Sequence, residues 1–312
     1  MRSPVRHAAL LFAATLAASG AAVALVGGAG DPISTGSSPA PNAEREANLA
    51  TPAPGPLCAQ TASPPRHRSE FPGEPSSSAP SAPTQAVPIL AYHYVRTDPD
   101  PTDVLGQRLS VTPRDFAAQM DLLHRSGAHA VSLADLLAAM RGDVLLPPHP
   151  VVLSFDDGHA DFLENALPVL QRDHLCATVF AVPDFLGKPS YLTVHQLETL
   201  AATGVRIGAH TMDHLDLNTQ PPPVVADQVV RSADVLRALT GQPVRDFAYP
   251  YGSFDATAVA AVQAAGFDDA VALAAQLPES WAGRFTLPRV EVIGGESLQA
   301  FAADAGIPFP AR

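Results

Sequence analysis

Two adjacent aspartates, Asp156 and Asp157, follow an apolar run that begins at Val151, in the stretch VVLSFDDGHADF. Adjacent like charges at the end of a buried strand cost free energy unless a cation or another partner compensates them. Asp-Gly after alternating apolar residues is also typical of a solvent-exposed hairpin turn. The stretch alone leaves both interpretations open, so the other polar residues of the chain have to decide between them.

A second group of candidate residues is the histidine pair His210 and His214, in the stretch GAHTMDH. A spacing of four residues brings two imidazoles to one side of a helical turn, where they can share a metal ion. Two histidines and one carboxylate form a set of three ligands that leaves positions open for water and substrate. The alternative is a pair of solvated loop histidines, because the chain has 11 histidines.

The two aspartates can hold different roles beside such a metal. Adjacent residues of a strand point to opposite faces, so one carboxylate can bind the metal while the other faces a water molecule as a base. A divalent cation would remove the repulsion between the carboxylates and lower the pKa of a bound water from about 15.7 toward about 7. The residue types and their spacing therefore indicate a site that activates water at mild pH.

The domain that must position these residues begins at Val87, where short apolar runs start to alternate with segments of helical spacing. The runs are apolar on both faces, as strands of a covered parallel sheet should be; they are VPILAYHYV, AHAVSL, HPVVLSF, CATVFAV, VRIGAH, VRDFAYP, DDAVALA and LPRVEVI. Helices are predicted over residues 115–126, 134–140, 161–172, 194–202, 224–239 and 255–265. Seven or eight such units in about 225 residues predict an α/β domain and favour a (β/α) barrel over an open sheet.

In an α/β barrel the functional groups lie at the carboxyl ends of the strands. The candidate residues at the predicted strand ends are His93, Asp156, Asp157, His210, His214, Tyr251, Gly252 and Arg289. Polar groups that could do acid–base or metal chemistry would therefore gather at one rim. The helix predicted from Asp161 also disfavours the hairpin interpretation of the aspartate pair, because no return strand follows.

The chain before this domain divides into two segments. Residues 1–30 contain basic residues, an uncharged stretch and the small-residue sequence Ala22-Val23-Ala24, which predict an export signal, with an uncleaved membrane anchor as the alternative. Residues 31–86 are rich in Pro, Ala, Ser and Gly and predict a disordered linker. Both interpretations of the first segment place residues 87–312, the expected catalytic domain, outside the cytoplasm, either secreted or held at the outer face of the membrane.

The composition gives no sign of a nucleic-acid partner. The formal net charge is −12, and no cluster of lysine or arginine occurs. The two cysteines, Cys58 and Cys176, lack the paired spacing of a zinc site. We expect no disulfide between them, because Cys58 lies in the predicted disordered linker, and we expect the protein to be a monomer.

The motifs SFDDG, HTMDH and FAYPYG, in this order, resemble those of the polysaccharide deacetylases of carbohydrate esterase family 4, the NodB-homology group. The resemblance runs from about Val87 to Val292. It implies a distorted (β/α)7-8 barrel and a metal-dependent hydrolase that removes N-acetyl groups from N-acetylglucosamine polymers and releases acetate. It also implies that Asp156 is the catalytic base and that Asp157, His210 and His214 bind the metal. Zinc is the expected metal, and cobalt, nickel or iron would suit the same ligands.

The sequence departs from the family pattern in the motif that often carries an arginine. Ala248-Tyr249-Pro250-Tyr251 occupies this position, so the arginine is absent. Arg289 could supply the missing charge beside Asp156, or it could be a surface ion-pair residue. The backbone N–H of Tyr251 is the expected donor to the oxyanion of the reaction.

Two further departures concern a histidine and a tryptophan. The family motif that carries the general acid is missing near the C-terminus, and Leu90-Ala91-Tyr92-His93 resembles it at the start of the domain, as in the branch that deacetylates poly-N-acetylglucosamine. His93 would then protonate the leaving amine, unless it is a structural histidine at a strand end. The tryptophan-bearing fourth motif has no match, and Trp281 could line a sugar groove or pack in the core.

Two alternative functions remain open at this point. One is an esterase that removes O-acetyl groups from a xylan-type polysaccharide, because both reactions pass through the same kind of oxyanion. The other is an inactive exported barrel that only binds sugars. For the deacetylase, peptidoglycan, chitin and poly-N-acetylglucosamine all remain candidate substrates.

Overall fold

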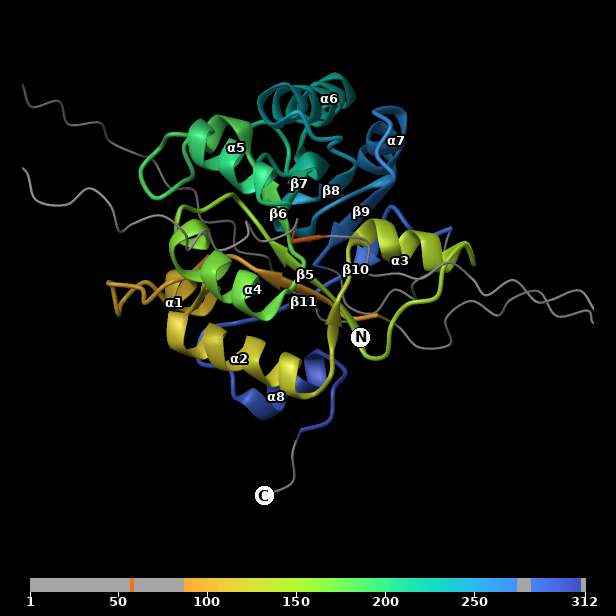
Figure 1. Ribbon diagram of the computed structural model, residues 1–312. Helices are drawn as coiled ribbons and strands as arrows, with labels where there is room; N and C mark the ends of the chain where they lie inside the picture. Colours follow the sequence, from red (N-terminus) through yellow and green to blue (C-terminus); the bar gives the residue numbers. More distant parts are fainter. Residues whose placement is uncertain (1–56, 59–86, 274–281, 310–312) are drawn as a thin grey trace, which may run out of the picture. The chain divides into compact units, whose positions relative to one another are not determined.

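A parallel β-sheet lies at the centre of the computed structural model, which describes residues 57–58, 87–273 and 282–309. Its strand order is β10-β9-β8-β7-β6-β5-β1-β11 (Figure 1). The short strand β4 lies outside this order and pairs with β5. The strands are β1 (Ile89–Tyr92), β4 (His129–Ala130), β5 (Pro150–Phe155), β6 (Thr178–Ala181), β7 (Arg206–Ala209), β8 (Asp246–Ala248), β9 (Asp269–Ala272), β10 (Leu287–Pro288) and β11 (Val290–Glu291). All eight apolar runs of the sequence therefore contain at least one strand.

The two ends of this sheet belong to one segment of chain. β10 pairs with β9 and β11 pairs with β1, and only Arg289 separates β10 from β11. The Arg289 N–H donates to the carbonyl of Ala272, whereas the Val292 N–H donates to that of Ala91, so the backbone partner changes within this segment. The sheet is thus nearly closed into a barrel, which confirms the predicted distorted (β/α) barrel.

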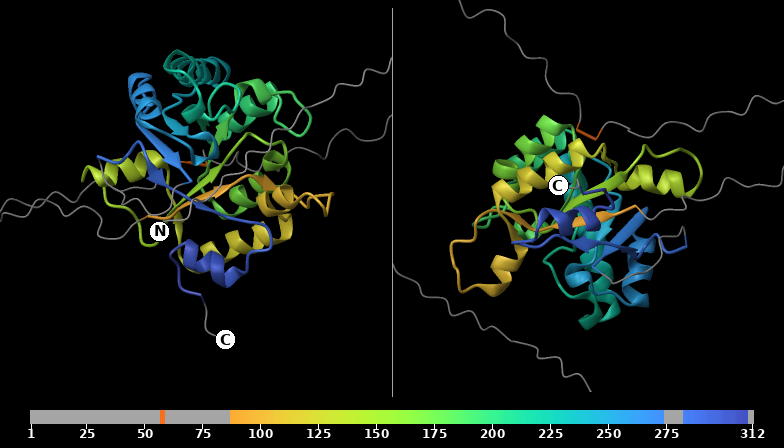
Figure 2. Two further views of the ribbon diagram at one scale, coloured as in Figure 1. Left: turned by 180° about the vertical axis from the view of Figure 1, so that it is seen from behind. Right: turned by 90° about the horizontal axis from the view of Figure 1, so that it is seen from below.

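The six predicted helices are all present, with ends within two residues of the predicted ones. They are α2 (Pro113–Arg125), α3 (Leu133–Met140), α4 (Leu167–Asp173) with the π-helical turn Phe162–Ala166 before it, α5 (Val194–Ala202), α6 (Pro222–Thr240) and α7 (Ala256–Ala264). Pro168 has no N–H group to donate inside α4, which accounts for the irregular start of this helix. Figures 1 and 2 show the helices on the outside of the strands, with α6 beside α7 and α2 beside α8 (Leu298–Asp304).

Several short elements were not predicted. They are α8, α1 (Val104–Leu109), the two-stranded sheet of β2 (Tyr94–Val95) and β3 (Ser110–Val111), and the 3-10 turns Pro183–Phe185, Leu217–Thr219 and Pro250–Gly252. Segments of two to seven residues are too short to show a helical or strand periodicity in the sequence. Their positions depend on the barrel against which they pack.

An aromatic cluster supports the ends of two central strands. Tyr92 of β1 and Phe155 of β5 stack with ring centroids 5.1 Å apart, and Phe116 and Phe162 pack edge-on against Phe155. Such ring pairs contribute about 0.5–1.5 kcal/mol each beyond the burial of their surface. Because His93 and Asp156 directly follow Tyr92 and Phe155, this packing fixes the points from which both polar residues leave the sheet.

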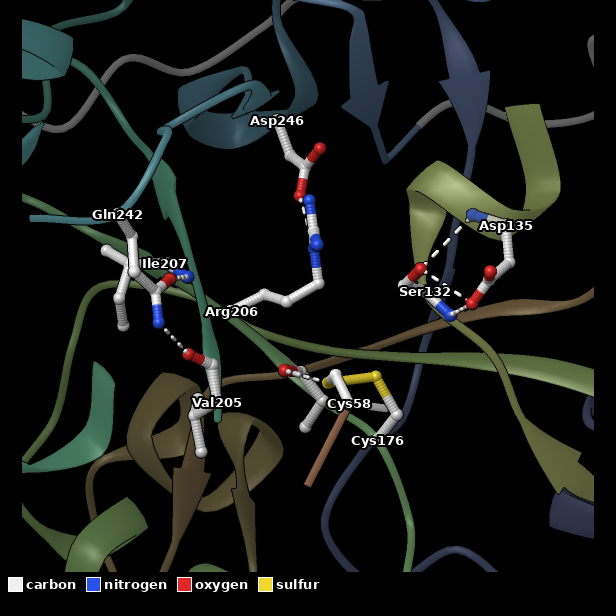
Figure 3. The surroundings of a disulfide bond; sticks show 10 residues. Cys58, Ser132, Asp135, Cys176, Val205, Arg206, Ile207, Gln242 and Asp246 are labelled. Atoms are coloured by element: carbon white, nitrogen blue, oxygen red, sulfur yellow. Dashed lines mark hydrogen bonds and ion pairs between the residues drawn. A yellow bond between two sulfur atoms is a disulfide. The ribbon is translucent and has the colours of Figure 1, made fainter. Parts of the chain in front are cut away.

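The expectation that the two cysteines remain unpaired is wrong, because Cys58 and Cys176 form a disulfide (Figure 3). The N–H groups of Leu57 and Cys58 donate to the carbonyls of Thr203 and Gly204, at 3.1 and 3.3 Å. Residues 57–58 therefore lie at the amino ends of β6 and β7. The composition of the linker did not reveal this contact, because the contact depends on backbone hydrogen bonds and one covalent bond. A disulfide is also typical of an oxidising, extracytoplasmic compartment.

The predicted export signal or membrane anchor and the rest of the linker lie outside the described residues. Within the described part of the chain, no helix combines the length and the apolar character that crossing a membrane requires. The boundaries at residues 30 and 86 stay predictions.

We expect loss of the disulfide to destabilise the domain. The bond closes a loop with a sequence separation of 118 residues, and removing such a bond typically lowers the free energy of unfolding by about 2–4 kcal/mol. Urea unfolding of the Cys58→Ser variant should show this loss. Dithiothreitol should lower the unfolding midpoint of the wild type and leave that of Cys58→Ser unchanged. An equal response of both proteins to dithiothreitol would show that the bond does not form in solution.

Candidate active site

The structure brings Asp157, His210 and His214 together at the carboxyl ends of β5 and β7. The Oδ1 atom of Asp157 lies 3.2 Å from Nε2 of His214 and 3.6 Å from Nε2 of His210. One ligand atom from each residue falls within 4.8 Å of the others. Two imidazole nitrogens and one carboxylate oxygen at these separations form a set that can hold one divalent metal ion.

The two histidines meet through a bent loop, so the expected helical turn is wrong. His210 directly follows β7, and residues 210–214 adopt no helix. Thr211 and His214 have left-handed backbones with φ of 61° and 64°, and the His214 N–H donates to Oγ1 of Thr211 at 2.9 Å. The buried side chain of Gln228, on α6, accepts hydrogen bonds from the N–H groups of Met212 and Asp213. The loop thus obtains the backbone hydrogen bonds that a helix would have provided.

Each histidine is oriented by its second ring nitrogen. Nδ1 of His210 lies 2.7 Å from the carbonyl of Ala248, so this nitrogen carries the proton and Nε2 is left with a lone pair. Burial lowers the pKa of His210 to about 4, despite the opposing charge of Asp156. The ring is therefore neutral at pH 7, as metal binding requires. Nδ1 of His214 lies 3.1 Å from the hydroxyl of Tyr251.

The carboxylate of Asp157 fits a bound cation. Its Oδ1 atom is buried and has no hydrogen-bond partner among the described residues, while Oδ2 lies 3.2 Å from Nε2 of His159. Burial raises the pKa of Asp157, but the hydrogen bond from His159 and the nearby imidazoles of His214 and His210 outweigh this effect and hold the pKa well below its usual range. An ionised, buried oxygen without a partner is costly. A metal ion at Oδ1 would remove this cost.

Asp156 forms a buried, two-pronged ion pair with Arg289. The two guanidinium nitrogens of Arg289 lie 2.7 and 2.6 Å from Oδ1 and Oδ2 of Asp156, and one of them also lies 3.2 Å from Oγ of Ser154. Asp156 is 2% exposed and Arg289 is 5% exposed. This burial excludes the surface ion-pair alternative for Arg289. Burial raises the pKa of Asp156, but the charge of Arg289 and the neighbouring His210 leave it lowered, so the carboxylate is ionised at neutral pH.

His93 and Tyr251 lie at the same rim. His93 follows β1, which neighbours β5 in the sheet, and it is among the charges that lower the pKa of Asp156. Its Nδ1 atom is buried without a hydrogen-bond partner among the described residues. Tyr251 has a left-handed backbone, with φ of 59°, and its side chain is 65% exposed beside His214. Trp281 lies outside the described residues.

Sequence reasoning missed three residues that support this site: Ser154, His159 and Gln228. His159 was visible as a polar residue two positions after the aspartate pair, but nothing in the sequence indicated its hydrogen bond to Asp157. Ser154 sits inside an apolar run, where a small hydroxyl gives no signal. Gln228 lies on a predicted helix, and only the folded loop shows that its oxygen accepts two backbone hydrogen bonds.

Comparison with known proteins shows which family this chain resembles. Residues 144–270 match the family model described as polysaccharide deacetylase. The chain is 28% identical over 217 residues to YxkH of Bacillus subtilis, which is named for the same family; the match covers 70% of this chain and 75% of YxkH. It is 24% identical over 225 residues to the poly-β-1,6-N-acetyl-D-glucosamine N-deacetylase of Staphylococcus epidermidis, covering 65% of this chain and 78% of that protein.

A solved structure shows the same architecture. The deacetylase PplD of Streptococcus pyogenes, solved in complex with acetate, superimposes with a TM-score of 0.64 at 25% identity. The superposition covers 70% of this chain and 97% of PplD. The family model, the relatives and the barrel agree, so residues 144–270 carry a polysaccharide deacetylase domain, and the chain has the fold of that family.

Proposed function

We propose that this protein is a metal-dependent hydrolase that removes N-acetyl groups from a polysaccharide containing N-acetylglucosamine and releases acetate. The observation that carries the proposal is the position of Asp157, His210 and His214 beside the buried pair of Asp156 and Arg289. The Staphylococcus epidermidis relative is named for this reaction on poly-β-1,6-N-acetyl-D-glucosamine, which supports the choice of substrate class.

Asp157, His210 and His214 would hold the metal, and zinc remains our first choice among zinc, cobalt, nickel and iron. When bound, a divalent cation supplies Lewis acidity toward a carbonyl oxygen and lowers the pKa of a water molecule. The unpartnered Oδ1 of Asp157 and the lone pair at Nε2 of His210 are the donors that support this assignment.

The remaining steps belong to residues of the protein. Asp156, ionised at neutral pH, takes the proton of the attacking water as general base. Arg289 keeps that carboxylate charged and fixes its direction through the two short hydrogen bonds. The backbone N–H of Tyr251 donates to the oxyanion, and His93 protonates the departing glucosamine nitrogen. The products are acetate and a free amine on the sugar.

We further propose that residues 87–312 form the catalytic domain and act outside the cytoplasm as a monomer, with residues 1–30 as an export signal or a membrane tether. The disulfide of Cys58 and Cys176 supports an extracytoplasmic location, because cytosolic reductants would remove it.

Acetate release from a panel of acetylated glycans tests the proposed function. The full-length protein is loaded with zinc and given poly-N-acetylglucosamine, chitin oligosaccharides, peptidoglycan and acetylated xylan, with Asp156→Asn as control. Release from an N-acetylated polymer by the wild type alone supports the proposal. Release from xylan alone would establish the O-acetyl esterase, and metal binding without any release would favour the inactive sugar-binding barrel.

Replacing His93 by alanine should lower acetate release about 100-fold, because a general acid contributes roughly 100- to 10,000-fold to such a step. The metal content should stay at the wild-type level, since His93 is not one of the three clustered ligand residues. Metal analysis and acetate assays on the same preparation check both expectations. Loss of metal from His93→Ala would make His93 a ligand or a residue needed for folding.

A further inference from the structure

A cluster of stacked rings lies beside the metal-ligand set and has no part in the mechanism above. The ring cluster consists of Tyr94, His159, Tyr191 and Phe185. The ring centroids of Tyr94 and His159 are 3.8 Å apart with planes at 25°, and the centroids of His159 and Tyr191 are 4.7 Å apart. Tyr191 in turn contacts Phe185 at 4.7 Å. His159 is therefore held between Tyr94 of β2 and Tyr191 of another loop, and it is 2% exposed.

Cations lie at both ends of the ring cluster. The guanidinium of Arg96 lies 3.7 Å from the centre of the Tyr94 ring. The ammonium of Lys188, the only lysine of the chain, lies 4.7 Å from the centre of the Phe185 ring. Cation–π contacts of this kind contribute favourable energy at partly exposed sites. They add to the stacking that keeps these rings in place.

Backbone pairing joins the loop of His159 to the loop of Tyr191. These two residues form an antiparallel bridge. The Leu192 N–H donates to the carbonyl of Gly158, and the Ala160 N–H donates to that of Ser190, each at 2.9 Å. The position of the His159 ring is thus fixed by its own backbone as well as by its neighbours.

The ring cluster touches two of the three metal ligands. Nε2 of His159 lies 3.2 Å from Oδ2 of Asp157, and the Phe185 ring lies 5.9 Å from the ring of His214. A carboxylate oxygen can only accept a hydrogen bond, so Nε2 of His159 is the donor. This bond occupies Oδ2 and leaves Oδ1 directed at the two ligand histidines.

We propose that His159 is a positioning residue that holds the carboxylate of Asp157 in its metal-binding orientation, with the ring cluster fixing the His159 ring. The inference rests on the metal site of the proposed function. Without the bond, the carboxylate could rotate and Oδ2 would lose its partner. Partners of this kind change metal affinity by about 10- to 100-fold in other sites.

Metal affinity tests this role separately from catalysis. The probe is Co²⁺, titrated into the full-length, metal-free protein and followed by its visible absorption. His159→Phe keeps a ring for stacking but removes the donor, and it should bind Co²⁺ about 10- to 100-fold more weakly. His159→Gln restores an N–H donor at similar reach and should stay within about threefold of the wild type. His195→Phe is the matched control, because His195 has a side chain that is 90% exposed on α5.

Tyr191→Leu tests the ring cluster itself and serves where His159→Phe does not fold. It leaves the hydrogen bond intact but removes the ring contacts of Tyr191 with His159 and Phe185, so Co²⁺ affinity should fall by about threefold to tenfold. Circular dichroism of the metal-free variants verifies the fold.

Three results would overturn the inference. The first is a folded His159→Phe variant that binds Co²⁺ as tightly as the wild type. The second is an equal loss of Co²⁺ affinity in His159→Phe and His159→Gln. The third applies where His159→Phe does not fold, and it is a Tyr191→Leu variant that binds Co²⁺ as tightly as the wild type. A wild-type protein that binds no Co²⁺ would instead overturn the metal site of the proposed function. A protein that binds Co²⁺ but releases no acetate would overturn that function alone.

Discussion

Asp156→Asn is expected to lower acetate release by about 1,000- to 10,000-fold while the protein keeps its metal. The amide has the shape of the carboxylate but cannot accept a proton from water at neutral pH. Asp156 is not among the three residues whose ligand atoms cluster, and its Oδ2 atom lies 4.0 Å from Nε2 of His210. The three ligands should therefore remain in place.

Asp157→Asn is the matched variant, because it makes the same chemical change one residue later. It replaces the charged Oδ1 that faces His210 and His214, so it should weaken metal binding, whereas the Asp156–Arg289 pair remains intact. Added metal should then restore part of the activity of Asp157→Asn and none of the activity of Asp156→Asn.

Metal analysis and acetate assays on both variants measure this division of roles. The assignment of the two aspartates would be wrong if Asp156→Asn lost its metal together with its activity. It would also be wrong if Asp157→Asn retained wild-type metal affinity.

The barrel and its rim could be predicted from the sequence because both depend on local patterns. Runs that are apolar on both faces mark the strands of a covered parallel sheet, and the residue after each run then falls at a known edge. His93, Asp156 and His210 are such residues, and the structure has them directly after β1, β5 and β7. Helices of eight or more residues were found for the same reason, since they show a complete apolar face.

The contacts between these residues could not be predicted, because they depend on loops and on distant segments. The bend that joins His210 to His214 relies on left-handed residues and on Gln228, which lies in another element. The disulfide joins positions with a separation of 118 residues. Arg289 could be read as buried or exposed, since the closure of the sheet around it becomes visible only in three dimensions.

Arg289→Met should lower the free energy of unfolding by about 3–5 kcal/mol. This loss is larger than the one expected on removal of the disulfide. Methionine fills a similar volume without charge, so Asp156 stays buried with its main partner removed. The pKa of Asp156 should then rise, because burial continues to raise it and the charge of Arg289 no longer opposes that effect. Acetate release should fall by about 100- to 1,000-fold, since less of the base is ionised and its direction is no longer fixed.

The loss of unfolding free energy in Arg289→Met should increase with pH. In the wild type the folded-state pKa of Asp156 is lowered, so its contribution to stability is present above the unfolded-state pKa and is lost as the pH falls through the folded-state value. In Arg289→Met the folded-state pKa is raised, so stability is lost as the pH rises from about 4, the unfolded-state value. The difference in unfolding free energy between the two metal-free proteins should therefore grow as the pH rises above about 4.

A double-mutant cycle separates the interaction energy of Asp156 and Arg289 from the contribution that each side chain makes by packing. Arg289→Met combined with Asp156→Asn removes both charges, so the double variant should be more stable at neutral pH than Arg289→Met alone. Arg289→Lys keeps a charge but loses the two-pronged geometry and the contact with Ser154, and it should lie between Arg289→Met and the wild type. Urea unfolding at pH 5 and pH 8 measures the wild type and all of these variants. Additive effects of the two single changes would mean that Arg289 contributes packing alone, because coupled charges in direct contact cannot act independently.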